Sequence, residues 1–271
     1  MQSYNYIIWD YSPFLYYSDY FQLRIYSVLF ALGLLFVYMK VSKKFLDKNH
    51  DIENFLFKLI ISTLVFSRIF HCLFYQFEYY SSNLIEILLP VQLSSFTFTG
   101  YQGLSSHGGL FGLFLGLFIF QKNKIKLLDR LHILLNILLY SFILMSLIRI
   151  GNLFNSEILG KECFEINFLC FIFPSYDMLP RYPVQLLEAF LYFILFVFFR
   201  YFSQSGYRDN VVKSIFTMLI ALGLVRFFVE FLKLPNTKIV FEYFNMAQLL
   251  TLLLLAISFI GYKFFATKSF K

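Results

Sequence analysis

Seven apolar stretches, most of them close to 20 residues long, alternate with polar segments along this chain. They cover residues 22–40, 56–76, 107–121, 131–149, 184–202, 212–231 and 246–264. A helix needs about 20 mostly apolar residues to cross the hydrocarbon core of a bilayer, and lipid requires each span to satisfy its own backbone hydrogen bonds. The pattern therefore predicts an all-α, polytopic integral membrane protein with about seven transmembrane helices. Only the third stretch is short for a span.

The composition agrees with a membrane protein of one domain. Only 14% of the 271 residues are charged, whereas a soluble domain carries about 25%. We therefore expect a single transmembrane domain over residues 1–271, with outer segments near 1–21, 77–106, 150–183 and 232–245. The formal net charge of +7 could suit nucleic acid, but the basic residues are arranged by membrane side, so no such partner is expected.

Alternate loops between the apolar stretches are basic, which predicts the orientation. The basic residues are Lys40, Lys43, Lys44 and Lys48 after the first stretch; Lys122, Lys124, Lys126 and Arg130 after the third; Arg200, Arg208 and Lys213 after the fifth; and Lys263, Lys268 and Lys271 in the tail. Cytoplasmic loops carry an excess of lysine and arginine. We therefore expect the N-terminus outside and the C-terminus in the cytoplasm.

Four arginines lie within or at the predicted outer ends of the spans: Arg24, Arg68, Arg149 and Arg226. An arginine in a bilayer usually faces a polar cavity or pairs with another group. Its planar guanidinium also fits a phosphate, to which it donates two parallel hydrogen bonds. Snorkelling to the headgroups explains any one of them, but four near one level of the membrane favour a polar site.

The stretch "SSHGGLFG" places His107 and three glycines at the start of the third apolar stretch. The glycines permit close backbone approach, and a helix that begins here would aim free N–H groups at an anion. His107 could then serve as a general base or as a donor to phosphate. The alternative is a histidine hydrogen-bonded to a neighbouring carbonyl.

The stretch "RIGNLFNSEILG", residues 149–160, gathers polar groups after an apolar span. Asn152 and Asn155 are three residues apart, so one helical turn would place them on one face. The alternative is a helix that ends here with Gly151 as its C-cap, followed by an asparagine-rich turn.

Two further stretches, "LPRYPVQLLEAF" and "GLVRFFVEFLKLPN", place polar groups near the outer ends of the fifth and sixth spans. Gln185 and Glu188 are three residues apart, whereas Arg226 and Glu230 are four apart and can pair on one face. A structural ion pair within the membrane is the alternative to a functional role. The three cysteines form no CxxC motif, but Cys163 and Cys170 could form a disulfide if their loop lies outside the cell.

Five motifs in order, "SSHGGLFG", "RIGNLFNSEILG", "LPRYPVQLLEA", "VRFFVEF" and "NMAQLL", resemble the prolipoprotein diacylglyceryl transferase family over about residues 12–262. The resemblance implies an enzyme of the bacterial inner membrane that moves an sn-1,2-diacylglyceryl group from phosphatidylglycerol to the lipobox cysteine of a precursor. That reaction forms a thioether and releases glycerol phosphate. It implies no cofactor and no metal. The implied partners are phosphatidylglycerol, the signal peptides of prolipoproteins and the bilayer.

The motif positions imply the roles of individual residues. The catalytic residues would be His107 as base and Arg149 and Arg226 at the phosphate. The substrate-binding residues would be Tyr26, Arg68, Gly108, Gly109, Asn152, Asn155, Glu157, Gly160, Gln185, Glu188 and Glu230.

The chain also departs from the family pattern. "SRIFH" replaces a glycine-rich motif of the second span, and Lys233 stands where arginine is frequent. These departures leave open a divergent or inactive paralogue that acts as a lipid-binding or scaffold protein. A membrane transporter that has kept the fold without the chemistry is a further alternative. A channel is disfavoured because the polar groups gather at one level of the membrane and do not line a full path.

Overall fold

The computed structural model describes residues 6–18, 22–45, 51–87, 91–92, 97–98, 103–120, 125–165, 168–202, 210–234, 239–241 and 244–265. The helices are α1 (Ile25–Phe45), α2 (Ile52–Phe74), α3 (Phe77–Tyr80), the 3-10 helix η2 (Leu84–Ile87), α4 (Ser106–Ile119), α5 (Leu127–Phe154), α6 (Val184–Phe202), α7 (Val211–Glu230) and α8 (Met246–Phe265). The strands are β1 (Ile7–Ile8), β2 (Phe14–Tyr17), β3 (Gln22–Arg24), β4 (Val91–Gln92), β5 (Thr97–Phe98), β6 (Phe171–Ile172), β7 (Ile239–Phe241) and β8 (Phe244–Asn245).

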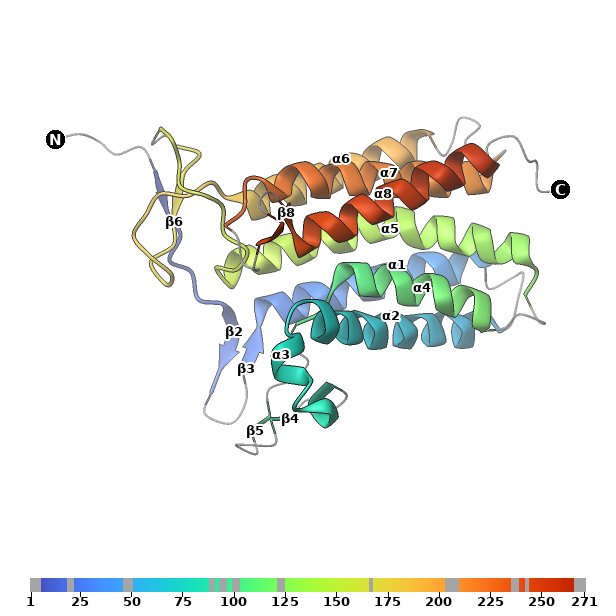
Figure 1. The fold of residues 1–271 in the computed structure, drawn as a ribbon, viewed down its shortest axis with the longest axis horizontal. Helices are drawn as coiled ribbons and strands as arrows, with labels where there is room; N and C mark the ends of the chain where they lie inside the picture. The colour runs from blue at the N-terminus through green and yellow to red at the C-terminus, as the bar shows by residue number, and fades with distance from the viewer. Residues whose placement is uncertain are drawn as a thin grey trace. The chain divides into compact units, whose positions relative to one another are not determined.

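Six of these helices, α1, α2, α5, α6, α7 and α8, are long and apolar enough to cross a membrane (Figure 1). They confirm a polytopic, all-α membrane protein. The third predicted span is the exception, because α4 has only 14 residues. At 1.5 Å per residue it is about 21 Å long, which is less than the ~30 Å hydrocarbon core.

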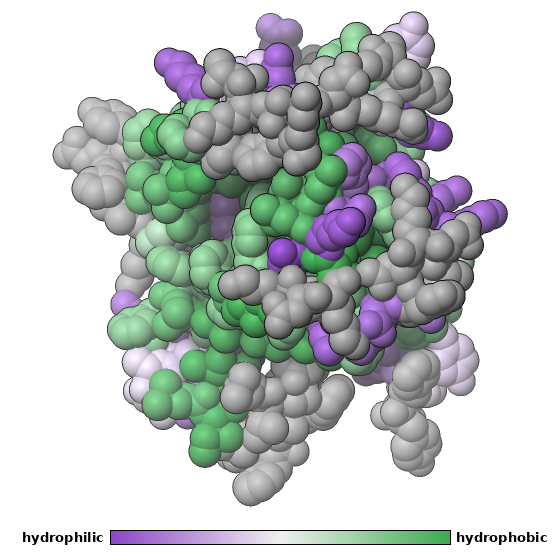
Figure 2. All heavy atoms as spheres, turned by 90° about the vertical axis from the view of Figure 1, so that its right-hand side faces the viewer, coloured by the Kyte–Doolittle hydropathy of each residue, from purple (hydrophilic) through white to green (hydrophobic). Residues whose placement is uncertain are grey.

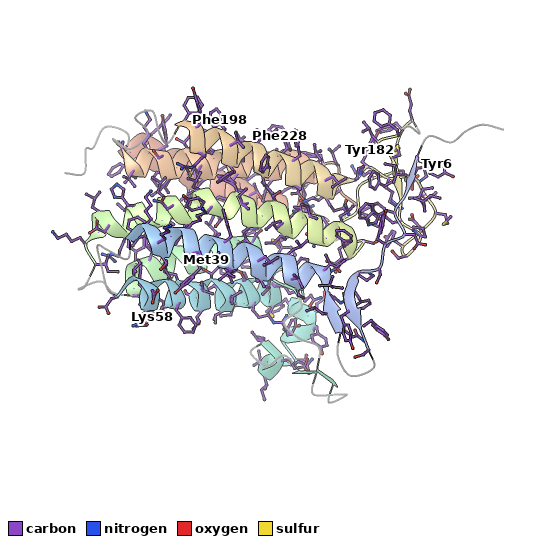
Figure 3. All side chains as sticks on the ribbon, turned by 180° about the vertical axis from the view of Figure 1, so that it is seen from behind. Tyr6, Met39, Lys58, Tyr182, Phe198 and Phe228 are labelled. Atoms are coloured by element: carbon purple, nitrogen blue, oxygen red, sulfur yellow. A yellow bond between two sulfur atoms is a disulfide. The ribbon has the colours of Figure 1, made fainter. Side chains whose placement is uncertain are left out.

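The outward surfaces of the long helices are apolar, as a lipid-facing surface requires. Phe198 on α6 and Phe228 on α7 point away from their helices in Figure 3 and are 47% and 64% exposed. Figure 2 looks onto the helix ends at the right of Figure 1, where purple, hydrophilic side chains lie among green, apolar ones. Of the basic residues at the predicted cytoplasmic ends, Lys43 and Lys213 are exposed, whereas Arg130 is buried and donates to the Leu117 carbonyl oxygen at 3.0 Å. The basic residues Lys48, Lys122, Lys124, Arg208, Lys268 and Lys271 lie outside the described residues, and the orientation stays a prediction.

The chain divides into two compact units. The first unit contains residues 1–41, 135–236 and 251–271, and the second contains residues 42–134 and 237–250. The first therefore holds most of α1, α5 and α8 together with α6 and α7, which pack against each other. The second holds α2, α3 and α4. A single domain over the whole chain stays a prediction.

Glycines on α4 set the packing of the second unit. α2 and α4 run side by side in Figure 1, and Gly108, Gly109, Gly112 and Gly116 of α4 are buried. A Cβ on Gly109 would lie 2.7 Å from Ser67 Oγ, and a Cβ on Gly112 would collide with the Ser62 carbonyl oxygen. Small residues let membrane helices approach closely. The glycines of "SSHGGLFG" therefore serve helix packing, which the sequence prediction did not include.

We expect Gly112→Ala to destabilise the protein by about 1–3 kcal/mol, because overpacking a tight contact forces backbone to move. The Ser62 hydroxyl, which donates to the Gly112 carbonyl oxygen at 2.7 Å, would be displaced as well. Gly116→Ala is the matched comparison, because its Cβ would meet Leu59 and Ser62 only at 3.1 Å. Thermal unfolding in detergent should show the larger loss for Gly112→Ala. Equal losses would contradict this packing argument.

Beyond the ends of the helices of the first unit, a small sheet is built from short segments around β6 (Figure 1). Backbone hydrogen bonds join β1 to β6 in parallel and join Phe171 to Arg181 in an antiparallel bridge. Further antiparallel bridges join Glu162 to Arg181 and Gly160 to Lys233. The segments lie in the order 7–9, 170–172, 180–182, 159–163 and 232–234.

A small apolar core and a disulfide stabilise this sheet. Leu153, Leu159, Phe171 and Phe173 form the buried core, with Trp9 packed against it. Cys163 and Cys170 form a disulfide with their Cα atoms 6.4 Å apart, as the sequence allowed. The sheet ties the N-terminal segment to the loop between α5 and α6. In Figure 3, Tyr6 and Tyr182 mark this part of the molecule.

Candidate active site

Arg149 lies in the last two turns of α5 and is held on two sides. Its Nε is 2.7 Å from Oε2 of Glu188 on α6, whose side chain is fully buried. Its Nη1 donates to Oδ1 of Asn152 at 3.0 Å. Arg149 itself is 8% exposed. A guanidinium has five N–H donors, so these two contacts fix its plane and leave donors for an anionic group.

The helix carrying Arg149 continues further than the sequence suggested. The alternative in which Gly151 caps the helix is wrong, because α5 runs to Phe154. Gly151 instead packs against α1, where a Cβ would lie 3.0 Å from the Tyr26 Cα atom. Tyr26, half-buried, is near enough to interact electrostatically with Arg149 and Glu157. The structure therefore brings Tyr26 to the end of α5, as its assignment as a site residue requires.

The turn after α5 presents a carboxylate held by two amides. Nδ2 of Asn152 and Nδ2 of Asn155 each donate to Glu157, at 3.2 Å, one to each carboxylate oxygen. Ser156 and Ile158 on either side have φ angles of 51° and 57°. Positive φ is a genuine outlier for a β-branched residue and costs of order 1–3 kcal/mol, so the surroundings must hold this turn in place.

A cavity of about 390 Å³ opens beside this turn. Its lining combines polar and apolar groups, namely Ser156, Glu157, Ile158, Leu159, Tyr176 and Leu234. The cavity is therefore amphiphilic, and the Glu157 carboxylate is its charged group.

Glu188 is the centre of the buried charges. Besides Arg149, its carboxylate contacts Nζ of Lys233 at 3.1 Å and accepts a hydrogen bond from the Tyr192 hydroxyl at 3.3 Å. Tyr192 also interacts with the half-buried Arg226 of α7. Glu230 forms an ion pair with Lys233 at 3.0 Å and also interacts electrostatically with Arg226, so Lys233 joins the predicted pair of Arg226 and Glu230 to a wider network.

Gln185 and Gly160 support the site through backbone contacts. Gln185 is fully buried, and its Nε2 donates to the Glu157 carbonyl oxygen at 2.7 Å. A Cβ on Gly160 would collide with the Tyr182 carbonyl oxygen and lie 2.7 Å from Val184. Gly160 therefore allows the sheet segments to pack closely, which fits a structural role better than contact with a substrate.

His107 lies in the second unit, in the first turn of α4, and is half-buried. Ser105 caps this helix by accepting from the Gly108 N–H at 3.4 Å, and the Ser105 N–H donates to the Ser67 carbonyl oxygen at 2.9 Å. The predicted helix start at this motif is confirmed. The backbone around His107 is thus fixed by a cap and by contact with α2.

The four arginines separate into two groups. Arg149 and Arg226 belong to the buried charges around Glu188. Arg24 is exposed and lies over the Phe14 ring, 5.3 Å from its centroid. Arg68, in the second unit, donates to the Tyr80 hydroxyl at 2.8 Å and to the Glu86 carbonyl oxygen at 3.2 Å. These contacts favour Arg68 as an anchor of the segment after α2 over direct binding of a substrate.

Lys233 is the site residue that sequence reasoning missed. The sequence showed it only as a departure from a frequent arginine, and its two carboxylate partners come from α6 and α7. Burial lowers the pKa of Lys233, and the neighbouring Glu188 opposes this change.

Beside the small sheet, a hydrogen bond from Arg181 lowers the pKa of Asp177 and stabilises the ion pair that they form.

The family profile of prolipoprotein diacylglyceryl transferase matches residues 13–263. A Bacteroides fragilis protein named phosphatidylglycerol–prolipoprotein diacylglyceryl transferase is 37% identical over 236 residues, covering 84% of this chain and 83% of the relative. Proteins of the same name from Chloroherpeton thalassium and Ehrlichia canis are 32% and 31% identical. Their alignments cover 86% and 88% of this chain and 84% and 90% of those relatives.

Proposed function

This chain belongs to the prolipoprotein diacylglyceryl transferase family, and on that premise we propose that it transfers the sn-1,2-diacylglyceryl group of phosphatidylglycerol to the lipobox cysteine of prolipoproteins. It is a multi-pass transferase of the bacterial plasma membrane, and its six long apolar helices agree with that location. The observation that carries the proposal is the buried Arg149, fixed by Glu188 and Asn152 beside a second arginine.

The reaction joins a thiol to a glyceryl carbon. The cysteine thiolate attacks the sn-3 carbon of the diacylglyceryl group, and a C–S bond forms while the C–O bond to the phosphate breaks. The electron pair of that bond leaves with glycerol phosphate, whose charge increases. Preorganised cations are the most effective way to stabilise charge that develops in a transition state. The guanidinium groups of Arg149 and Arg226 serve this purpose here.

The thiol must lose its proton before it attacks, because the thiolate is the nucleophile. His107 takes this proton as general base, since imidazole titrates near neutral pH. The fixed first turn of α4 supports this role, because the Ser105 cap and the buried Gly108 and Gly109 hold the backbone that carries the ring. No step requires a metal or a cofactor.

The contacts divide the other site residues into three groups. Asn152, Asn155 and Glu157 form a polar turn beside the amphiphilic cavity, where hydroxyl groups of the lipid headgroup can be bound. Tyr26, Glu188 and Glu230 surround the arginines. Gly160 and Arg68 hold segments of the chain in place. A scaffold without chemistry has no need for this buried ionic network, which favours the enzyme over the lipid-binding alternative.

The release of glycerol phosphate tests the proposed donor. Purified protein in vesicles containing phosphatidylglycerol should release glycerol phosphate only when a lipobox peptide is added. A peptide with serine in place of cysteine should release none, because an alcohol at neutral pH is a much weaker nucleophile than a thiol. Release that is independent of the peptide would indicate a lipase and would contradict the proposal.

A further inference from the structure

Lys233 is a third cation at the site, buried like Arg149 and near the half-buried Arg226. Its side chain is 6% exposed, and its Nζ bridges two carboxylates, Glu188 Oε1 at 3.1 Å and Glu230 Oε2 at 3.0 Å. Burying a charge is costly unless it is paired and hydrogen-bonded. The lysine therefore belongs to a built arrangement that links α6 to the end of α7.

The backbone around Lys233 is fixed from one side by the small sheet. Residue 233 pairs with Gly160 in an antiparallel bridge. The Lys161 N–H donates to the Leu232 carbonyl oxygen at 2.8 Å, and the Leu234 N–H donates to the Leu159 carbonyl oxygen at 2.9 Å. These bonds set the place of the lysine independently of any ligand. The lack of a side chain on Gly160 permits this sheet packing.

The charges of the cluster leave one positive charge in excess. Three cations, Arg149, Arg226 and Lys233, face two carboxylates, Glu188 and Glu230, so the sum is three minus two, or +1. A phosphodiester carries a single negative charge and would make the cluster neutral. Without Lys233 the sum falls to zero, and the two carboxylate oxygens that it holds, Glu188 Oε1 and Glu230 Oε2, compete with the phosphate for the guanidinium groups.

We propose that Lys233 is a positioning residue for the transfer reaction. By holding Glu230 and Oε1 of Glu188, it limits the contact of Glu188 with Arg149 to Oε2 and leaves the remaining guanidinium donors available to the phosphodiester of the lipid. This inference rests on the proposed function. Because Lys233 then acts in binding of the anionic donor, its loss should mainly raise KM for phosphatidylglycerol and change kcat less.

The test compares purified full-length variants in the transfer assay while the phosphatidylglycerol content of the vesicles is varied. Lys233→Met should raise KM for this lipid about tenfold or more with a smaller change in kcat, because loss of one partner from a buried charge pair is expensive. Lys233→Arg should stay close to the unaltered protein, since a guanidinium can also bridge two carboxylates.

A charge-balancing double variant separates this role from simple loss of structure. K233M/E230Q returns the sum to two minus one, or +1, and should regain most of the KM that Lys233→Met loses. If Lys233→Met does not fold, K233M/E230Q is compared with the unaltered protein, and their KM values should differ by less than about threefold, because removing one cation together with its carboxylate partner from a buried site costs little.

The outcomes separate a failure of the role of Lys233 from a failure of the proposed function. An unaltered KM in a folded Lys233→Met variant, a loss confined to kcat, or a double variant no better than Lys233→Met would overturn the role of Lys233. Absence of transfer by the unaltered protein itself would overturn the proposed function, and this inference with it.

Discussion

Replacing Arg149 by alanine should lower kcat/KM for transfer by at least about 100-fold, because removing one preorganised electrostatic contact from a transition state typically costs 10²–10³ in rate. Arg149→Lys should recover little of this loss. In the structure the guanidinium contacts Glu188 with Nε and Asn152 with Nη1. A single ammonium cannot make both contacts and also present two parallel donors to a phosphate.

The matched control for Arg149 is Arg24→Ala. Arg24 also lies at the predicted outer end of a span in the same unit, but it is exposed and lies over the Phe14 ring. Activity should be measured together with thermal unfolding, so that a folded but inactive Arg149→Ala can be recognised. A fully active Arg149→Lys variant would show that positive charge alone is sufficient and that the two-point contact is unnecessary.

His107→Ala and His107→Gln should both lose transfer while they continue to bind phosphatidylglycerol. General-base loss typically costs about 10²–10⁴-fold in rate, far more than the ~1 kcal/mol of a structural hydrogen bond. Binding should survive because the arginines hold the phosphate. Turnover and lipid affinity therefore have to be measured on the same preparations.

His132→Gln is the histidine control. His132 lies on α5 with its ring nitrogen 2.9 Å from the Leu128 carbonyl oxygen, a contact within one helix. It should change neither turnover nor affinity. If His107→Gln turns over at nearly the normal rate while His107→Ala binds lipid weakly, His107 is a donor that positions the phosphate, and another group takes the thiol proton.

The spans could be predicted from sequence because the bilayer imposes a length and an apolar composition on each helix. The ends of the helices were harder to place. Gly151 has the sequence signature of a helix cap, but α5 continues through it to Phe154. The glycine is explained by the close packing of α1, which leaves no room for a side chain at this position. The motif likewise predicts Gly108 and Gly109 as substrate contacts, whereas the structure packs them against Phe66, Ser67 and Phe70 of α2, about 40 positions earlier in the chain, and a local motif does not reveal such a neighbour.

The residues of the site could be named from motifs, but their partners could not. Spacing of four predicted that Arg226 pairs with Glu230. Arg226 does interact electrostatically with Glu230, but tertiary packing adds Lys233, which contacts Glu230 and also Glu188, 45 positions earlier in the chain. Arg149 and Asn152, which lie three apart on α5, likewise form a hydrogen bond along one helix. Local periodicity therefore predicts contacts along a helix and misses those made where helices meet.

The mass of a lipobox peptide after incubation with purified protein and phosphatidylglycerol is the most direct measurement of the proposed reaction. We expect the peptide to gain one diacylglyceryl group on its cysteine, with the added mass retained after hydroxylamine treatment at neutral pH, because the thioether and the oxygen esters of the two acyl chains resist the reagent at this pH and a thioester does not. An unmodified peptide, or an addition that hydroxylamine removes, would contradict diacylglyceryl transfer.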